Sequence, residues 1–98
     1  MKIEQTREGS VLTVTLEGRL DTITAPQLDA ALSAALDDVT GLTLDCAGLE
    51  YISSAGLRVL LKTQKALHPR GGVTLTHVNE TVAEVLDITG FSDFLTIV

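Results

Sequence analysis

The chain has 98 residues and carries a net charge of −6 at pH 7, with a pI near 4.6. This length forms one domain, residues 1–98, and the 45% of hydrophobic residues can supply a small core. The acidic balance argues against a nucleic-acid binder, which needs a basic surface for phosphates. It fits a basic or mixed-charge protein partner as well as it fits plain solubility.

Cysteine content and hydropathy narrow the class of protein further. Cys46 is the only cysteine, which excludes an intramolecular disulfide and a cysteine zinc cluster, and we expect it in the core. No apolar run reaches the roughly 18 residues of a transmembrane helix. The first seven residues are too polar for a signal peptide. We therefore expect a cytoplasmic protein without membrane insertion.

The chain opens with two short strands. Residues 2–7 have mixed polarity and predict an edge strand, and residues 8–10 predict a hairpin turn. In residues 11–17 leucine and valine alternate with threonine, which predicts a strand with one buried face. Gly18 is expected to end this strand, and residues 20–22 to form the loop before the first helix.

A helix is predicted next. Thr24 to Gln27 reads as a capping box with Pro26 in the first turn, where the missing N–H group costs nothing. An apolar stripe follows from Leu28 to Leu36. Asp37 and its neighbour Asp38 suit the negative end of a helix poorly, so we expect the helix to fray there and a loop to follow.

The central part of the chain is a strand followed by a helix. Residues 42–46 predict a strand that breaks at 47–48, and leucines at helical spacing predict a helix after Ser53 and Ser54. The first N–H groups of a helix have no partner within it, so a hydroxyl can cap them and a phosphate can bind them. Gly56 would let a backbone or a phosphate approach closely.

The last third of the chain repeats this alternation. Residues 68–72 contain several helix breakers, and residues 73–78 predict a strand. Asn79 can cap a third helix that ends at Gly90, and residues 94–98 predict a final strand.

The order of elements predicts an α/β fold: a mixed, mostly parallel five-stranded sheet in the order β-β-α-β-α-β-α-β. Right-handed crossovers place the helices mainly on one face of the sheet. Threonine marks the other face of strand after strand, so that face is exposed, partly covered or an interface.

Two motifs resemble one family. The run Ser53-Ser54-Ala55-Gly56-Leu57, eight residues after Asp45, is similar to the signature of STAS-domain anti-sigma factor antagonists. The segment Gly18-Arg19-Leu20-Asp21 fits a second signature of that family, and the resemblance spans residues 2–98. It implies a single STAS domain with a STAS-like fold in a bacterial regulator of transcription.

The resemblance also implies a partner-switching mechanism. The unphosphorylated protein would bind an anti-sigma factor serine kinase and free a sigma factor. Phosphorylation at Ser54 would switch it off, and a PP2C-type phosphatase would reset it. Many members have aspartate where this chain has Ser53, so Ser53 is the second candidate acceptor. The expected partner-binding residues are Asp21, Ser53, Ser54, Gly56, Leu57 and Arg58.

Plain structural roles stand beside these functional ones. Ser54 can be a simple helix cap, and Ser53 can be a polar loop residue or the actual cap. Asp21 follows the second strand, where loops gather at one edge of a parallel sheet, and it could stand beside Ser54 or form an Asx turn. Asp45 is expected at the end of the central strand, at the same edge. Arg58 lies in the first turn of the serine helix, an unfavourable place for a cation.

Other classes of function find little support. His68 and His77 have no ligand pattern around them, so no metal is expected. The chain has no recognisable catalytic triad, no G-x-S-x-G elbow and no phosphate-binding loop, so we expect no enzyme and no cofactor. The kinase would bring the nucleotide. The alternative is a constitutive STAS subunit of a larger complex, such as a lipid ABC transporter.

Overall fold

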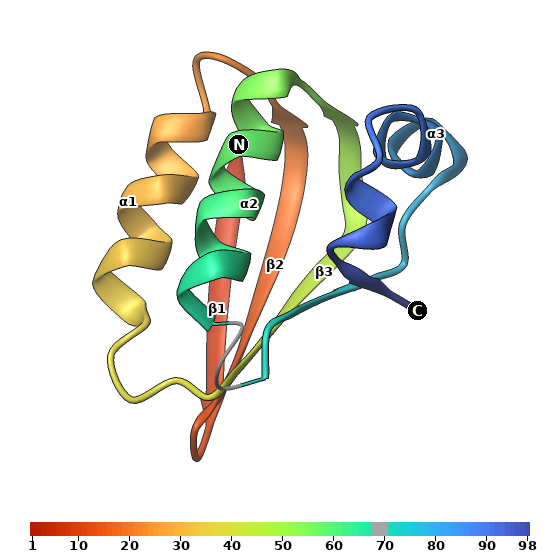
Figure 1. Cartoon of the computed structure of the whole chain (residues 1–98). Helices are drawn as coiled ribbons and strands as arrows, with labels where there is room; N and C mark the ends of the chain where they lie inside the picture. The colour runs from red at the N-terminus through yellow and green to blue at the C-terminus, as the bar shows by residue number, and fades with distance from the viewer. Residues whose placement is uncertain (68–70) are drawn as a thin grey trace.

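The computed structural model describes residues 1–67 and 71–98 (Figure 1). Its strands and helices are β1 (Lys2–Glu8), β2 (Val11–Leu20), α1 (Ala25–Ala35), β3 (Gly41–Ile52), α2 (Ser54–Leu67), β4 (Val73–Thr76), α3 (Glu80–Ile88), the 3₁₀ turn η1 (Phe91–Asp93) and β5 (Thr96–Ile97). The order is the predicted one, and part of the predicted stop at 68–72 lies outside the described residues. No helix in these two ranges is both long and apolar enough to cross a membrane.

The strands form one sheet in the order β1-β2-β3-β4-β5. β1 pairs antiparallel with β2, and every other pair is parallel. Each parallel neighbour is reached through a helical connection, and right-handed crossovers in one direction bring the helices to one face. In Figure 1 α1 and α2 lie side by side, with α2 in front of β1. The predicted mixed, mostly parallel sheet is confirmed.

The core lies between the sheet and the helices. Leu12 and Val14 of β2 stand beside Leu42 and Leu44 of β3, and all four are almost fully buried. Helix residues that close this core from the other side include Leu28, Leu32, Leu57, Leu60, Leu67, Val82 and Leu86. The alternation of apolar and polar residues in the strands thus determines which face the helices cover.

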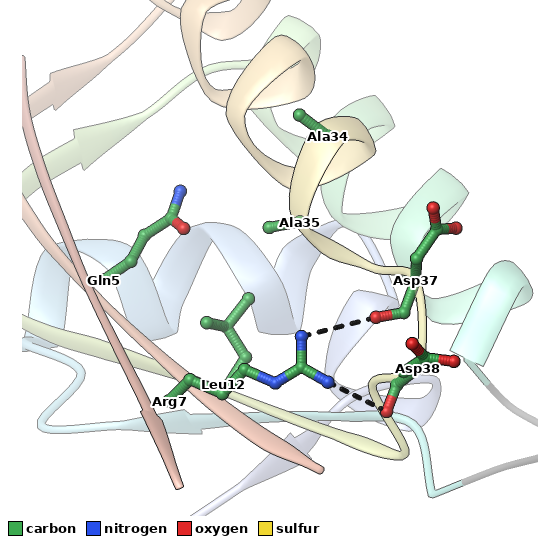
Figure 2. Close-up of a pocket in the computed structure, with 7 residues that line it drawn as sticks. All are labelled: Gln5, Arg7, Leu12, Ala34, Ala35, Asp37 and Asp38. Atoms are coloured by element: carbon green, nitrogen blue, oxygen red, sulfur yellow. Dashed lines mark hydrogen bonds between the residues drawn. The ribbon is translucent and has the colours of Figure 1, made fainter. Parts of the chain in front are cut away.

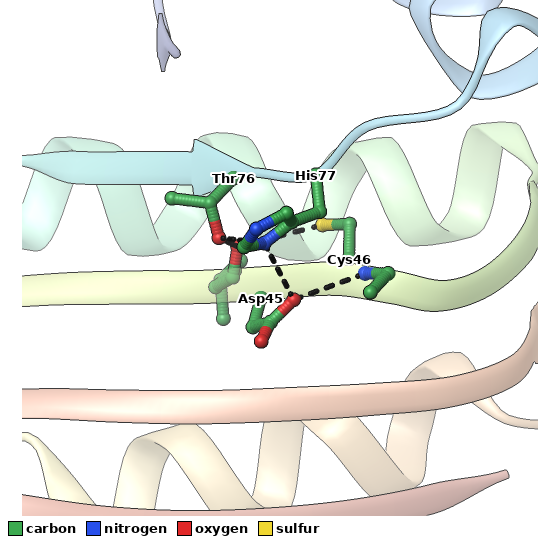
Figure 3. A network of polar contacts seen from close by, with 6 residues as sticks. Asp45, Cys46, Thr76 and His77 are labelled. Carbon is green, nitrogen blue, oxygen red and sulfur yellow. Dashed lines mark hydrogen bonds and ion pairs between the residues drawn. The ribbon is translucent and has the colours of Figure 1, made fainter.

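Threonines line the opposite face of the sheet. Thr6, Thr13, Thr43, Thr74 and Thr96 are partners in register across all five strands. Figure 3 looks onto this face, with the helices behind the strands. The isolated chain therefore leaves the predicted threonine face open.

The two central strands are longer than predicted. Gly18 does not end β2: it lies inside the strand at φ +106°, and β2 runs on to Leu20. β3 does not break at Ala47 but continues to Ile52. The pairing of β2 with β3 shifts register twice, between Thr15 and Glu17 and again after Gly18, as bulges do. These bulges carry the glycines that made the sequence look like a loop.

The end of the chain also differs from the prediction. The strand predicted over 73–78 ends at Thr76, and His77 follows at φ +57°. The strand predicted over 94–98 is reduced to β5, because Phe94 still belongs to the turn after η1 and its amide donates to the carbonyl of Phe91. Asn79 caps α3 as predicted, and its Oδ1 accepts from the Val82 amide at 2.8 Å.

Candidate functional site

The two serines occupy different positions at the start of α2. Ser53 precedes the helix, and its Oγ accepts a long hydrogen bond of 3.4 Å from the Gly56 amide. The Ser53 carbonyl accepts from the Leu57 amide at 2.9 Å, as a capping residue does. Ser54 is the first helical residue, is exposed, and its hydroxyl has no hydrogen bond among the described residues. The cap is therefore Ser53, and the hydroxyl of Ser54 is free.

A hydrogen bond joins the serine turn to the end of β2. The Ser53 amide donates to the Leu20 carbonyl at 2.8 Å. Because Asp21 directly follows Leu20, this bond places the loop of Asp21 beside the serine turn. The two signature segments, far apart in sequence, thus meet at one edge of the sheet. The Asp21 carboxylate and the Ser54 hydroxyl do not contact each other in this structure.

Asp21 organises the loop between β2 and α1. Its Oδ1 accepts from the amides of Ile23 (3.0 Å) and Thr24 (3.1 Å), and its carbonyl accepts from the Ala25 amide at 2.8 Å. The hydrogen bond from the Thr24 amide is the largest cause that lowers the pKa of Asp21 below its usual value. The Asx-turn role is therefore present, and the carboxylate is ionised at neutral pH.

The predicted capping box at Thr24 does not form. Thr24 has helical backbone angles (φ −91°, ψ −20°) and makes no side-chain cap. Its hydroxyl instead donates to the Arg19 carbonyl at 2.7 Å and accepts from the Asp21 amide at 2.9 Å. The turn begins earlier, at Asp21, so the aspartate takes the capping work that the sequence pattern assigned to threonine. Pro26 does lie in the first turn, as predicted.

Ile23 is an exposed apolar residue in this loop that the sequence reasoning missed. Its side chain is 86% exposed, although its amide is held by Asp21. A rigid loop that presents a large apolar side chain to solvent loses little entropy when a partner buries that side chain. The available signal was an isoleucine between two threonines, outside the apolar stripe of the following helix.

Gly56 and Leu57 are buried and pack the start of α2 against the sheet. A Cβ atom on Gly56 would lie 2.6 Å from Leu20 Cγ and 3.0 Å from Ile52 Cγ1. The atoms that approach this glycine closely are therefore core side chains of β2 and β3, not the backbone or phosphate that was expected, and this contact lets α2 pack on the sheet. Leu57 is 4% exposed and belongs to the core. Arg58, by contrast, is exposed on the outer face of α2.

Asp45 lies away from the serine edge. Because β3 continues past it, Asp45 is in the middle of the strand and on the threonine face, not at the predicted end (Figure 3). Its Oδ1 accepts from the Ala47 amide at 3.1 Å, which satisfies a backbone group at the bulge. The same oxygen lies 3.1 Å from His77 Nδ1. Asp45 therefore has a structural role in the sheet.

The remaining candidate ligands do not gather. The described residues contain no group of three or more His, Cys, Asp or Glu side chains that could hold a metal ion, and His68 lies outside them. Cys46 is buried, and burial is the main cause that raises the pKa of its thiol to about 12.

A hollow lies beside the end of α1, at the edge of the sheet opposite the serine turn. It is lined by Arg7 and by residues at the end of α1 (Figure 2). The Arg7 guanidinium donates to the carbonyls of Asp37 (3.4 Å) and Asp38 (3.3 Å), in the turn that follows α1. Arg7 thus holds the turn after α1, away from the serine turn.

Comparison with known proteins gives one family and one fold. The family described as "Mlab, STAS domain" matches residues 3–97. A relative from Bordetella bronchiseptica, provisionally named anti-sigma factor antagonist BtrV, is 38% identical over 93 residues, covering 93% of this chain and 80% of the relative.

Solved structures share the arrangement described above. An anti-sigma factor antagonist from Mycobacterium paratuberculosis superposes with a TM-score of 0.88 at 24% identity, covering 98% of this chain and 83% of that chain. Unphosphorylated SpoIIAA, an anti-sigma factor antagonist, gives 0.84 at 21% identity, covering 99% of this chain and 88% of that chain. Phosphorylated SpoIIAA of Bacillus superposes with a TM-score of 0.76 at 19% identity, covering 99% of this chain and 91% of that chain.

Proposed function

Because this chain belongs to the family of STAS-domain anti-sigma factor antagonists, we propose that its unmodified form binds an anti-sigma factor that is also a serine kinase. Binding withdraws the anti-sigma factor from a sigma factor, which then joins RNA polymerase. The protein acts by docking rather than by catalysis, in the cytoplasm where its partners are. The name of the Bordetella relative supports the role of antagonist.

The docking surface is the loop of Asp21 together with the start of α2. Ile23, Ser54 and Arg58 are its exposed side chains, and Gly56 and Leu57 support it from the core. The Ser53–Leu20 hydrogen bond holds the two segments in one rigid unit. Ile23 supplies apolar area, and Asp21 and Arg58 supply charges of opposite sign for orientation.

The observation that carries the proposal is the exposed hydroxyl of Ser54, which has no hydrogen bond among the described residues at the start of a helix. The kinase transfers the γ-phosphoryl group of ATP to Ser54 Oγ: an oxygen–phosphorus bond forms, the bond to ADP breaks, and the hydroxyl proton goes to a base of the kinase. The chain has no nucleotide-binding motif, so the kinase brings the ATP.

The phosphate acts through its charge. It adds about −1.5 to −2 charges at pH 7 on a surface that already carries the ionised Asp21. A loss of about 3 kcal/mol, roughly a hundredfold in affinity, is enough to change partners. A PP2C-type phosphatase hydrolyses the ester and restores the docking form.

The fold is expected to survive the modification. The first amides of a helix accept a phosphate without rearrangement, so α2 does not need to melt. The likeness of this chain to both solved forms of SpoIIAA supports this expectation. Amide exchange of the phosphorylated protein measures it, and loss of protection throughout α2 would contradict it.

The proposal is tested by incubating the protein with its kinase and ATP and mapping the phosphate by mass spectrometry. We expect phosphate on Ser54 in the wild type and in Ser53→Ala, and none in Ser54→Ala. The phosphorylated protein should no longer bind the kinase. Phosphate on Ser54→Ala would move the acceptor to Ser53, and no phosphate on any variant would contradict the switch.

A second candidate is a constitutive STAS subunit of a larger complex such as a lipid ABC transporter. The description of the matching family names the STAS domain and no phosphorylation switch, so it fits this candidate as well. In that case Ser54 is an ordinary surface residue and the partner stays bound. Genes for an anti-sigma kinase and a phosphatase beside this one favour the switch, and genes for an ABC transporter favour the subunit.

A further inference from the structure

All the charged side chains of α2 are positive, although the whole chain is acidic. Arg58, Lys62 and Lys65 are the charged residues of α2, which has no acidic residue, although the whole chain carries −6. Their spacing of four and three residues places them on one exposed face of the helix. Ser54 precedes Arg58 by four residues, so it lies on this face as well. We refer to Ser54, Arg58, Lys62 and Lys65 as the α2 ridge.

Only some of the positive charges on the α2 ridge are paired with an acidic side chain among the described residues. Lys62 Nζ lies 3.0 Å from Asp29 Oδ1 of α1, so its charge is matched within the fold. Arg58 has no ion pair and no side-chain hydrogen bond among the described residues, and Lys65 has no ion pair there. Arg58 is also the fifth residue of α2, close to the positive end of the helix dipole. Its charge therefore gains nothing from the isolated fold.

We infer that Arg58 is the residue through which phosphorylation of Ser54 acts on the partner, an inference that rests on the proposed function. In the unmodified protein the guanidinium binds an acidic group of the anti-sigma factor. In the phosphorylated protein it binds the phosphate on Ser54 instead, and the partner's acidic group loses its counter-charge. The phosphate thus removes one attraction in addition to bringing its own repulsion.

Helix geometry supports the intramolecular pair. Side chains four residues apart on a helix are neighbours, and each points back toward the N-terminus, so Arg58 extends toward Ser54. An acid placed N-terminal to a base at this spacing is the favourable orientation. The Ser54 hydroxyl and the Arg58 guanidinium make no side-chain hydrogen bonds among the described residues. No existing hydrogen bond therefore has to break when a phosphate on Ser54 pairs with Arg58.

Charge complementarity indicates the chemistry of the partner's surface. Asp21 and Arg58 lie on the two joined segments of the docking surface and have opposite charges. A partner that fits both presents a basic group to the loop of Asp21 and an acidic group to the start of α2. This pattern fixes orientation, because a partner turned around would bring like charges together.

The intramolecular pair can be tested without any partner. Phosphoserine is incorporated genetically at position 54, and its second pKa is measured by phosphorus NMR in the wild type, Arg58→Gln and Lys65→Gln. We expect Arg58→Gln to raise this pKa by about 0.2 to 0.4 units, the size of one such helix pair. Lys65→Gln, two turns further along the same ridge, should leave it unchanged. Equal values in all three proteins would overturn the pair.

The role toward the partner is tested with the anti-sigma factor kinase encoded in the same genome. Unphosphorylated Arg58→Gln should bind it about tenfold more weakly than the wild type and with a smaller salt dependence, whereas Lys65→Gln should bind normally. If Arg58→Gln binds like the wild type while phosphorylation still abolishes binding, the inference fails and the proposed function stands. If no variant binds and no phosphate is transferred, the proposed function itself fails.

Discussion

The amide nitrogen of Ser53 lies 2.8 Å from the carbonyl oxygen of Leu20, and this hydrogen bond joins the start of α2 to the end of β2. On one side of it Asp21 caps the first helix, and on the other Ser53 caps the second. Both caps use polar groups that could otherwise have faced a partner. Among the described residues, the groups still free at this edge include the hydroxyl of Ser54, the side chains of Ile23 and Arg58, and the second carboxylate oxygen of Asp21.

Replacement of the two serines should separate stability from function. Ser53→Ala removes a cap whose hydrogen bond is long, so we expect a loss of about 0.5 to 1 kcal/mol in the free energy of unfolding. Ser54→Ala removes an exposed hydroxyl without a bond and should change stability by less than about 0.5 kcal/mol. Urea denaturation measures both, and a larger loss for Ser54→Ala would contradict the assignment of the cap.

Gly56→Ala should destabilise the fold. The added methyl group would lie 2.6 Å from Leu20 Cγ, and Leu20 is itself fully buried. Overpacking of this kind costs about 1 to 3 kcal/mol, which exceeds the gain in helix propensity from glycine to alanine of about 1 kcal/mol. Ala66→Gly, at an exposed position of the same helix, is the control for propensity. A more stable Gly56→Ala protein would show that α2 does not pack this closely.

The sequence predicted the element order and the buried faces well because hydrophobic alternation depends on local spacing. It failed at Gly18 and Ala47, where bulges keep the chain within the sheet although glycine usually marks a turn. It also failed at Thr24, because the Thr24 hydroxyl is occupied by the Arg19 carbonyl and the Asp21 amide. These outcomes depend on hydrogen bonds between segments, such as Ser53 with Leu20, which no local pattern contains.

Asp21→Asn should be less stable than the wild type in a pH-dependent way. The fold lowers the pKa of Asp21 from 3.8, so the ionised carboxylate contributes stability that is complete above that value. This contribution is lost as the pH falls from 3.8 through the lower pKa of the folded protein. We therefore expect the gap in unfolding free energy between the two proteins to be constant from pH 5 to 8 and to close in acid. A gap that widened in acid would contradict the capping role.

Ile23→Asp should weaken binding of the anti-sigma factor at least tenfold without loss of stability, because the side chain contacts solvent in the free protein. Ile88→Asp is a matched control, since Ile88 is also exposed (77%) but lies in α3. Isothermal titration with the kinase compares the two. Equal effects at both positions would mean that the loop of Asp21 is not the docking surface.

Cys46 should resist thiol reagents in the folded protein. Its side chain is 2% exposed, and burial raises its pKa to about 12, so thiolate is scarce at pH 8. Reaction with a chromogenic disulfide should be slow in buffer and complete within minutes in denaturant. Fast reaction in buffer would show that the core opens readily around β3.

A switch operated at Ser54 can be detected by mass spectrometry of the protein purified from its native host. Intact mass and fragment ions would be recorded after growth, stress and starvation. We expect a fraction of the protein to carry one phosphate on Ser54, and we expect this fraction to change between these conditions. A protein that never carries phosphate and always co-purifies with the same partner would contradict it and favour the constitutive subunit.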